Sequence, residues 1–572
     1  MNPATACARV LVDELVRHGV REAVLCPGSR SAPLAFALHA ADGAGALRLH
    51  VRTDERSAAF LALGLAKASG RAVPVVTTSG TAVANLHPAV LEASHASVPL
   101  LLLTADRPPE LRATGANQTT DQVAIFGSAV RWQHDLGTPD DRPGQAPTWR
   151  SVASRAVLAA QGDRGGQPGP VHLNLPFREP LVPDGSPGGA ERDGRADGSP
   201  WTSAAPQAIS TEPIDDDGRR TLVLVGDLPL AGPDWGAAAA EVAQAHGWPV
   251  VAEPSSRGAR VRALPHGSLL LGSADWLDAH RPERVVVVGR PTLSRAVAAL
   301  LGHDATDVDL VGPSGPWPDP GARVRRVLPL EALRAPGHHA GVAHPDWLAA
   351  WERAGRAVAQ AVSPLTADSW PSGLAVAATL LDRLGTDTSL FVGSSNPVRD
   401  LDLAGAGGGP LVAASRGLAG IDGCLSTAVG VALAHDRPTY ALMGDLTFLH
   451  DVAGLVVGPH EPQPNLTVVV VNDDGGGIFT TLEPGAPQHS DAFDRVFGTP
   501  HGADLAGFCA GAGVEHVSAQ TAEELAAEIG LRPVGLRVVE VRVDRSAHRD
   551  LRDRLHQAAA SALSDRAGSP AS

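Results

Sequence analysis

The chain has 572 residues, of which 47 are lysine or arginine and 62 are aspartate or glutamate, so its formal net charge is −15. A prior of roughly 150 residues per domain predicts three or four domains. The acidic balance argues against a general nucleic-acid-binding protein, because such proteins neutralise phosphates with a basic face. Lys67 is the only lysine. Because this bias towards arginine is typical of a GC-rich genome, the number of arginines is no functional signal by itself.

The sequence also limits where the protein works. Asp13 and Glu14 lie where a signal peptide needs an apolar segment, so we expect no export signal. The longest apolar runs, such as 98–103 and 466–471, are far shorter than the roughly 20 residues of a membrane helix. The four cysteines are scattered without a CxxC pair, which predicts neither a disulfide framework nor a zinc site. We therefore expect a cytoplasmic protein without a membrane partner.

Short apolar runs alternate with alanine-rich helical stretches, which is typical of βα units that form parallel sheets. Their apolarity is continuous rather than alternating, and this indicates strands covered by helices on both faces. The runs form three groups, so we expect an α/β protein with three doubly wound parallel-sheet domains. The predicted strands are 23–26, 73–77, 99–104 and 171–175, then 221–225, 249–252, 284–288 and 307–311, then 389–392, 410–413, 439–443, 466–471 and 535–543.

Two changes in composition predict domain boundaries. Residues 182–200 mix proline, glycine, aspartate and serine without periodicity, which is typical of an exposed linker. A turn-rich stretch at 331–345 precedes a strongly periodic helical pattern at 346–362. The predicted organisation is a first domain at 1–185, a linker at 186–200, a central domain at 201–345, a third domain at 346–560 and a tail at 561–572.

In the third group, polar residues follow two predicted strands directly. Gly444 and Asp445 follow the strand 439–443, and the sequence NDDGGG at 472–477 follows the strand 466–471. Ligands of parallel sheets bind beyond the carboxyl ends of the strands, so these residues should share one edge. Carboxylate and carbonyl oxygens suit Mg²⁺, and glycines allow a phosphate to approach the backbone. Either motif alone would also fit an ordinary turn.

The pairing of the two motifs is more specific than either motif. Asn472 follows Asp445 by 27 residues, an interval that resembles the diphosphate and metal motif of thiamine-diphosphate enzymes. Eight segments in the same order resemble one family of these enzymes, the 2-succinyl-5-enolpyruvyl-6-hydroxy-3-cyclohexene-1-carboxylate synthases of menaquinone biosynthesis. The segments are CPGSRSAPL (26–34), TDERSAAFLALGLAK (53–67), TTSGTAVANLHPAV (77–90), LLTADRPPEL (102–111), GANQTTDQ (115–122), SRGLAGIDGCLSTAVG (415–430), GDLTFLHD (444–451) and NDDGGGIF (472–479).

This resemblance covers the first and third groups densely and the central group only through the segment 289–295. It implies a pyrimidine-binding domain, a central transhydrogenase-like domain and a diphosphate-binding domain, in that order. It also implies a homodimer or homotetramer with each active site between the first domain of one subunit and the third domain of another. The implied cofactors are thiamine diphosphate and Mg²⁺ or Mn²⁺.

The resemblance implies a catalytic role for Glu55, whose carboxyl group would bind N1′ of the cofactor and promote loss of the proton at C2. Taken alone, Glu55 would fit a solvated acidic residue in the first turn of a helix equally well. Ile421 matches the apolar wedge that holds the cofactor bent, although a core isoleucine is the alternative. The implied cofactor-binding residues are Glu55, Ile421, Gly444, Asp445, Gly475, Gly476 and Ile478.

For the metal, the resemblance implies the Asp445 carboxylate and the Gly475 carbonyl, but it leaves the second side-chain ligand open. Aligning the family motif by Ile478 and Phe479 places its ligand asparagine at Asp473. The interval of 27 residues after Asp445 places it at Asn472 instead. One inserted residue in the loop 456–465 would reconcile the two counts. We favour Asp473 and keep Asn472 as the alternative.

The implied reaction decarboxylates 2-oxoglutarate and adds the succinyl-semialdehyde unit to isochorismate. Both substrates are dicarboxylates, which guanidinium groups bind well. A surface salt bridge is the alternative role for each arginine, and core packing is the alternative for the apolar residues. A second hypothesis is another thiamine-diphosphate 2-oxo acid decarboxylase or acetohydroxyacid-type synthase. The implied substrate residues are Arg30, Arg107, Asn117, Gln118, Arg295 (the weakest match), Ser395, Arg399, Arg416, Ile478, Phe479 and Leu482.

Overall fold

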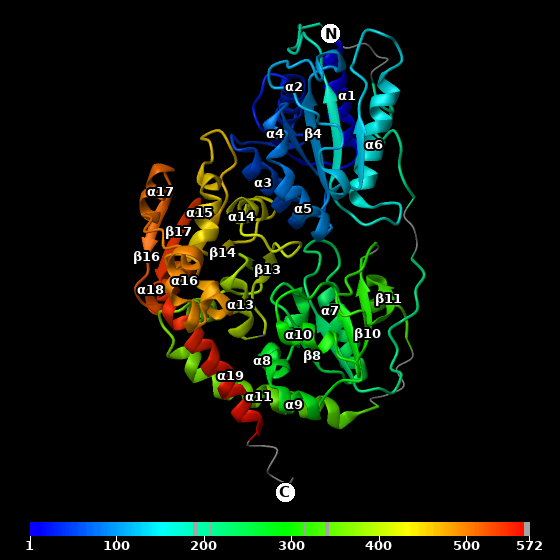
Figure 1. Ribbon diagram of the computed structural model, residues 1–572. Helices are drawn as coiled ribbons and strands as arrows, with labels where there is room; N and C mark the ends of the chain where they lie inside the picture. The colour runs from blue at the N-terminus through cyan, green and yellow to red at the C-terminus, as the bar shows by residue number, and fades with distance from the viewer. Residues whose placement is uncertain (187–192, 206–208, 314, 338–342, 406, 565–572) are drawn as a thin grey trace.

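The computed structural model describes residues 1–186, 193–205, 209–313, 315–337, 343–405 and 407–564. Their strands form three sheets in which all pairings between neighbouring strands are parallel. Figure 1 shows the first sheet at the top in blue and cyan, the central sheet in green, and the third in yellow to red. The predicted three-sheet α/β fold is confirmed. Within the described residues, no helix is long and apolar enough to cross a membrane.

The first sheet is covered by helices on both faces, as its continuous apolar strands predict. Its strand order is β2-β1-β3-β4-β6-β5. The strands are β1 (Glu22–Leu25), β2 (Arg48–Val51), β3 (Val73–Thr77), β4 (Leu100–Asp106), β5 (Trp132–Asp135) and β6 (Val171–Pro176), and the helices are α1 (Pro3–Arg17), α2 (Ala32–Gly43), α3 (Glu55–Ser69), α4 (Thr81–Ala84), α5 (His87–Ala96) and α6 (Ala146–Gln161).

The third sheet repeats this arrangement with the order β13-β12-β14-β15-β17-β16. Counted from its own first strand, that order is the same as in the first sheet, which favours an origin of the two units by duplication. The strands are β12 (Ser389–Val392), β13 (Leu411–Ala414), β14 (Thr439–Gly444), β15 (Leu466–Asn472), β16 (Glu515–Ser518) and β17 (Leu536–Arg542), and the helices are α12 (Gly373–Arg383), α13 (Asn396–Leu403), α14 (Cys424–Leu433), α15 (Asp445–His450), α16 (Ser490–Phe493), α17 (Leu505–Gly511), α18 (Ala522–Gly530) and α19 (His548–Ser564).

The central sheet has five strands in the order β11-β10-β9-β7-β8. Two helices from beyond residue 345 pack into its core: Trp347 and Trp351 of α11 and Leu555 of α19 are buried with Leu222 and Val285 of the sheet. The predicted boundary at residue 345 therefore does not separate two hydrophobic cores, because helices that follow it in the sequence pack on the central sheet. The strands are β7 (Thr221–Val225), β8 (Val250–Ala252), β9 (Arg284–Val288), β10 (Asp307–Gly312) and β11 (Val324–Pro329), and the helices are α7 (Trp235–His246), α8 (Gly267–Gly272), α9 (Ala274–Ala279), α10 (Arg295–Leu301) and α11 (Pro345–Ala367).

The predicted linker and tail lie partly outside the described residues. Of the linker 186–200, residues 187–192 are not described, and of the tail 561–572, residues 565–572 are not described. Helix α19 continues to Ser564, four residues beyond the predicted end of the third domain, because its last turns still bury Ala559 and Leu563.

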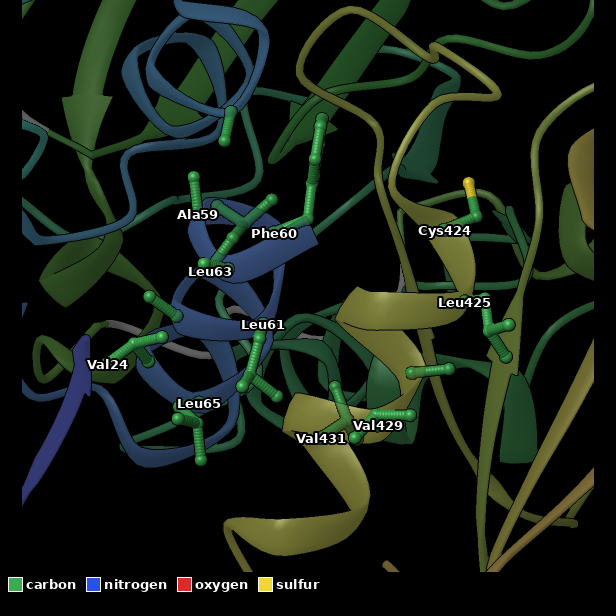
Figure 2. Packing of buried hydrophobic residues seen from close by; sticks show 14 of the residues in the cluster. Val24, Ala59, Phe60, Leu61, Leu63, Leu65, Cys424, Leu425, Val429 and Val431 are labelled. Carbon is green, nitrogen blue, oxygen red and sulfur yellow. The ribbon is translucent and has the colours of Figure 1, made fainter. Parts of the chain in front are cut away.

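Helices α3 and α14 join the first and third units, and their side chains form one hydrophobic cluster (Figure 2). Glycines allow the two backbones to approach closely. A Cβ atom on Gly64 would lie 2.1 Å from the Thr427 carbonyl oxygen, and one on Gly430 would lie 2.3 Å from the Leu61 carbonyl oxygen. The contact fixes the direction of α3, and so the position of Glu55 at its first residue.

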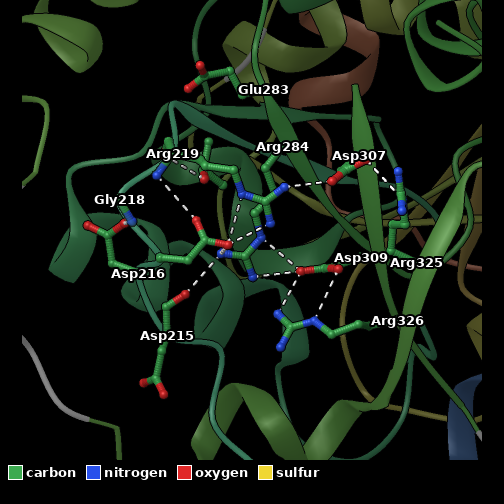
Figure 3. Close-up of polar contacts among 12 residues, drawn as sticks. Asp215, Asp216, Gly218, Arg219, Glu283, Arg284, Asp307, Asp309, Arg325 and Arg326 are labelled. Carbon is green, nitrogen blue, oxygen red and sulfur yellow. Dashed lines mark hydrogen bonds and ion pairs between the residues drawn. The ribbon is translucent and has the colours of Figure 1, made fainter. Parts of the chain in front are cut away.

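A network of charged side chains, with Arg284 and Asp309 buried at its centre, occupies the amino end of the central sheet (Figure 3). Arg284, the first residue of β9, is fully buried and lies 2.7 Å from the Asp309 carboxylate, and Arg326 contacts the same carboxylate at 2.7 Å. A second carboxylate, that of Asp217, lies 3.6 Å from Arg284. Because ligands of parallel sheets bind at the carboxyl ends of the strands, this cluster has a structural role at the opposite edge.

Candidate active site

The carboxyl ends of β14 and β15 carry the predicted cofactor residues. Asp445 begins α15 directly after β14, and its Oδ2 accepts a hydrogen bond from the Gly475 N–H at 2.9 Å. Its Oδ1 accepts from the Leu446 N–H at 2.6 Å. The GD motif and the glycine-rich turn are therefore in direct contact, as the pairing of the two motifs predicts. The Nε2 atom of His501 also lies 3.0 Å from Asp445 Oδ2.

The electrostatics at this edge suit a cation. Asp445 is buried, and burial together with the neighbouring Asp473 carboxylate raises its pKa to about 6. Two carboxylates in a poorly solvated place repel each other unless a positive charge lies between them. Within the described residues, no group of three His, Cys, Asp or Glu side chains could hold a metal ion. A metal here would need backbone oxygen as well, and the Gly475 carbonyl is the candidate.

Asn472 and Asp473 differ in how their side chains are engaged. The Asn472 amide donates to Glu540 Oε1 at 2.7 Å, and its Oδ1 accepts from the Asp474 N–H at 3.0 Å. Both polar ends of this buried side chain therefore have protein partners. Within the described residues, Asp473 has one polar side-chain contact, with the His548 ring at 3.0 Å from Oδ2. This arrangement favours Asp473 over Asn472 as the second ligand.

The turn that follows β15 has no room for side chains at its glycines. Gly475 has φ +138°, and a Cβ atom there would lie 1.9 Å from the Gly498 carbonyl oxygen. A Cβ atom on Gly476 would lie 2.1 Å from the Phe497 carbonyl oxygen, and one on Gly477 would overlap the Asp473 carboxylate. The sequence GGG thus allows the backbone to fold closely against the segment 494–498. Such a turn exposes peptide groups to a bound phosphate.

We expect Gly475→Ala to weaken binding of thiamine diphosphate about tenfold or more, because the new methyl group forces the turn away from the Gly498 carbonyl and strains the backbone. Calorimetric titration of the cofactor would measure the change. Gly511→Ala is the control, since a Cβ atom there meets no atom within 4 Å. Equal affinities in the two variants would contradict this prediction.

The loop after β13 carries Arg416 and Ile421, and one buried carboxylate holds it in place. The Gly417 and Leu418 N–H groups donate to Glu92 of α5 at 2.8 and 2.7 Å. The Arg416 guanidinium donates to Thr292 Oγ1 at 2.8 and 2.9 Å. Ile421 is half-buried rather than part of a closed core, and lies just before α14.

Glu253, at the end of β8, fixes the segment that Arg416 contacts. Its Oε1 accepts from the Thr292 and Leu293 N–H groups at 2.8 and 2.9 Å. Burial raises the pKa of this carboxyl group to about 7, above its ordinary value of 4.5. The central unit therefore contributes to the site by holding Thr292 against Arg416.

We expect Glu253→Gln to make the protein more stable at pH 8, by up to roughly 3 kcal/mol, and to change little at pH 4.5. The folded wild-type protein favours the protonated Glu253 carboxyl group. The contribution of this group to wild-type stability is therefore fully present below pH 4.5 and is lost as the pH rises towards 7 and above, whereas glutamine does not titrate. Urea unfolding midpoints at both pH values would measure it. Glu241→Gln, at an exposed position of α7, is the control. A difference that does not depend on pH would refute the assignment.

Ser395 and Arg399 follow β12 and lie near other arginines. Ser395 has φ 76°, a strained conformation of the kind that gathers at functional sites. Arg399 Nη1 donates to the Ser395 carbonyl at 2.7 Å. Burial lowers the pKa of the Arg399 guanidinium, and the positive charges of Arg552, Arg416 and Arg295 lower it further. Arg295 itself is exposed and pairs with Glu483 at 2.9 Å.

A second group of predicted substrate residues lies at the first sheet. Arg107 donates to Ser79 Oγ at 3.1 Å, and Gln118 donates to the Ser79 carbonyl at 2.9 Å. Burial and the nearby Arg107 lower the pKa of the buried Arg30 guanidinium. Asn117 is exposed in the adjoining loop. Among the described residues of one chain, no hydrogen bond or ion pair joins this group to Arg399 or Arg416.

Glu55 is the first residue of α3 and is half-buried. Its neighbours contact the third unit: Arg56 donates to the His450 carbonyl at 2.7 Å, and Ser57 donates to Asp451 Oδ1 at 2.9 Å. His450 ends the helix that Asp445 begins. Glu55 therefore begins a helix whose first turn contacts the end of α15 opposite to Asp445.

The predicted apolar wall lies on the short helix η7 (Gly477–Thr481) and the residue after it. Ile478, Phe479 and Leu482 are each half-buried, so they are neither closed core nor fully exposed surface. The ring of Phe479 lies 5.5 Å from that of Phe497. These side chains are available to a ligand at the edge that Asp445 and Gly475 form.

Several residues that contact the site escape the sequence patterns. His501 and His548 contact the two candidate metal-binding carboxylates, and Glu92 and Glu253 anchor the segments around Arg416. No local motif marks them, because each reaches the site from a distant part of the chain. Their only signal in the sequence is a lone ionisable residue in an otherwise apolar or helical stretch.

Comparisons with known proteins agree with this geometry. Residues 5–125 match the family described as "Thiamine pyrophosphate enzyme, N-terminal TPP binding domain", and residues 408–531 match "Thiamine pyrophosphate enzyme, C-terminal TPP binding domain". The fold and the site thus define an enzyme dependent on thiamine pyrophosphate, which is thiamine diphosphate.

The relatives in curated collections narrow this class. The 2-succinyl-5-enolpyruvyl-6-hydroxy-3-cyclohexene-1-carboxylate synthases of Saccharopolyspora erythraea and Kineococcus radiotolerans are each 50% identical over 98% of this chain and 100% of their own length. The synthase of Nocardia farcinica is 49% identical over 96% of this chain and 98% of its own. The chain belongs to the 2-succinyl-5-enolpyruvyl-6-hydroxy-3-cyclohexene-1-carboxylate synthase family.

Proposed function

We propose that the protein is a transferase that decarboxylates 2-oxoglutarate and adds the resulting succinyl-semialdehyde unit to isochorismate. The products are CO₂ and 2-succinyl-5-enolpyruvyl-6-hydroxy-3-cyclohexene-1-carboxylate, for menaquinone biosynthesis. The observation that carries the proposal is the cluster of arginines around Arg399, next to the edge where Asp445 meets the glycine-rich turn. Mutually repelling guanidinium groups favour ligands with several carboxylates, as both substrates have.

Each group of residues has a distinct part in this proposal. When bound, thiamine diphosphate supplies the nucleophilic carbon for the 2-oxo acid. Glu55 would hold a proton between its carboxylate and a ring nitrogen of the cofactor. Asp445, Asp473 and the Gly475 carbonyl would hold Mg²⁺ or Mn²⁺ against the diphosphate, because their hard oxygens suit such ions. Arg399 and Arg416 would orient the acidic substrates, and Ile478, Phe479 and Leu482 would exclude water from the ring.

We further propose a homodimer or homotetramer with sites between subunits. Two observations support it. The groups around Arg107 and around Arg399 belong to different sheets of one chain, and the first turn of α3, which Glu55 begins, contacts the end of α15 opposite to Asp445. A second copy could present its own Glu55 and Arg107 to the third sheet. The free, buried state of the four cysteines supports the proposed cytoplasmic location.

The test is a product analysis by mass spectrometry with labelled 2-oxoglutarate, with and without isochorismate, in the presence of cofactor and Mg²⁺. We expect the adduct and labelled CO₂ when both substrates are present. Release of CO₂ from pyruvate alone, without any adduct, would instead favour a different 2-oxo acid decarboxylase or an acetohydroxyacid-type synthase. No turnover despite measured cofactor binding would overturn the catalytic proposal altogether.

A further inference from the structure

A cavity of about 480 Å³ lies between the central unit and the third unit. It is bounded by the start of α10, by α13, by the end of the apolar wall at Leu482, and by one face of α19. Four arginines line it, two of them from α19, which no motif singles out. They are Arg295, Arg399, Arg549 and Arg552.

These arginines differ in whether protein carboxylates neutralise them. Arg552 pairs with the buried Asp400 at 3.1 Å, and Arg295 pairs with Glu483. Arg549 donates to the Leu482 carbonyl at 2.8 Å, and Arg399 donates to a carbonyl in the same way. Neither Arg549 nor Arg399 makes an ion pair with any residue that the structure describes.

The acidic side chains of the cavity do not balance the charge of its four arginines. Asp402 is half-buried and makes no ion pair with a described residue, although its carboxylate interacts electrostatically with Arg399 and Arg552, and burial raises its pKa to about 6. Asp553 is exposed at the rim. A guanidinium group has five N–H donors, so Arg399 and Arg549 retain donors for a ligand. Two such cations facing one cavity favour an anion.

The position of Arg549 shows which substrate it would meet. Leu482, whose carbonyl Arg549 holds, ends the apolar segment that we propose as the wall around the isochorismate ring. Arg549 and Arg552 are three residues apart, so they are neighbours on the helix face. An anionic group bound between Arg399 and Arg549 would therefore project from the acceptor ring rather than from the 2-oxo acid.

We propose that Arg549 is a substrate-binding residue and that, with Arg399, it binds a carboxylate of the acceptor dicarboxylate in this cavity. The inference rests on the proposed function, because it places one carboxylate of isochorismate between Arg399 and Arg549. It adds the C-terminal helix to the residues that select the acceptor.

The test compares Arg549→Ala and Arg549→Lys with Arg554→Ala. Arg554 is an exposed residue of the same helix, and it pairs with Asp550 at 3.8 Å. Because a charge-assisted hydrogen bond is lost, we expect Arg549→Ala to raise the KM for isochorismate about tenfold or more. The KM for 2-oxoglutarate and the Kd for thiamine diphosphate should stay within about twofold of the wild type. Arg554→Ala should match the wild type.

Two further measurements separate binding from a structural role. Arg549→Lys should recover part of the affinity, and added guanidinium ion should partly rescue Arg549→Ala, because each restores a positive donor. If Arg549 only held the Leu482 carbonyl, kcat and both KM values would change together, without rescue, and the inference would be wrong. A wild type that forms no adduct would refute the proposed function. An active wild type with Arg549→Ala equal to Arg554→Ala would refute this inference alone.

Discussion

Replacing Glu55 by glutamine is expected to lower kcat about 10²- to 10⁴-fold with saturating cofactor, because the amide has almost the same shape but cannot exchange a proton with the cofactor ring. The fold should be unaffected. Asp54, not Glu55, caps α3 by accepting from the Ser57 N–H, and the packing of α3 on α14 involves later residues. The rate of product formation with both substrates at saturating concentrations would measure the loss of kcat.

The control for this variant is a nearby carboxylate with a structural role. Glu461 accepts from the Val51 N–H and lies 3.5 Å from Arg52, so Glu461→Gln should lower stability rather than kcat. Calorimetric titration should show that Glu55→Gln still binds the cofactor, since the residues at β14 and β15 are intact. Near wild-type product formation by Glu55→Gln would remove Glu55 from the catalytic machinery.

The same variant tests where the active sites lie. Glu55→Gln and Asp445→Asn subunits, each inactive alone, can be mixed and allowed to exchange. If each site combines Glu55 of one subunit with Asp445 of another, one site of every mixed dimer is intact, and about a quarter of the wild-type activity should return in a statistical mixture. If both residues of a site come from one chain, mixing should restore nothing.

The parts of the fold that the sequence predicts well are the buried ones. Central strands such as β3 and β15 are apolar throughout, because helices cover both faces, and the predicted ranges agree closely with the structure. Four strands of the described chain, β2, β5, β11 and β16, lie outside the predicted ranges, and all are at sheet edges. Their sequences mix charged and apolar residues, as in RLHV and EHVS, since edge strands are partly exposed. Continuous apolarity does not detect them.

The residues of the candidate site also fall into those that the sequence predicts and those that it does not. Asp445 and the glycine-rich turn are adjacent to strand ends, so the parallel sheet brings them together by a general rule. His501, Glu253 and Arg549 come from segments with no fixed spacing to those strands, and tertiary packing alone brings them in. The choice between Asn472 and Asp473 as the second metal ligand also depends on tertiary structure, because Glu540, which comes from a distant strand, forms a hydrogen bond with the Asn472 side chain.

Asp445→Asn is expected to weaken Mg²⁺-dependent binding of thiamine diphosphate at least tenfold and to abolish most activity. The change removes one of two hard anionic ligands at the end of β14 and β15. The protein should still fold, because the amide oxygen can accept from the Gly475 N–H in place of Oδ2, and only the Leu446 N–H loses its side-chain acceptor. Cofactor titrations at several Mg²⁺ and Mn²⁺ concentrations would measure the effect. An unchanged metal dependence would exclude Asp445 as a ligand.

Asp473→Ala and Asn472→Ala should separate the two candidates for the second ligand. Asp473 faces Asp445 closely enough to raise its pKa, so its removal should weaken metal and cofactor binding and lower the pKa of Asp445. The Asn472 side chain binds Glu540 and the Asp474 N–H, so Asn472→Ala should lower the free energy of unfolding by about 1–3 kcal/mol, because the buried Glu540 Oε1 loses one of its two donors and the Asp474 N–H loses its acceptor. Its metal dependence should remain that of the wild type. The reverse pattern, with metal affinity lost only in Asn472→Ala, would assign the ligand to Asn472 and support the 27-residue interval over the count from Ile478.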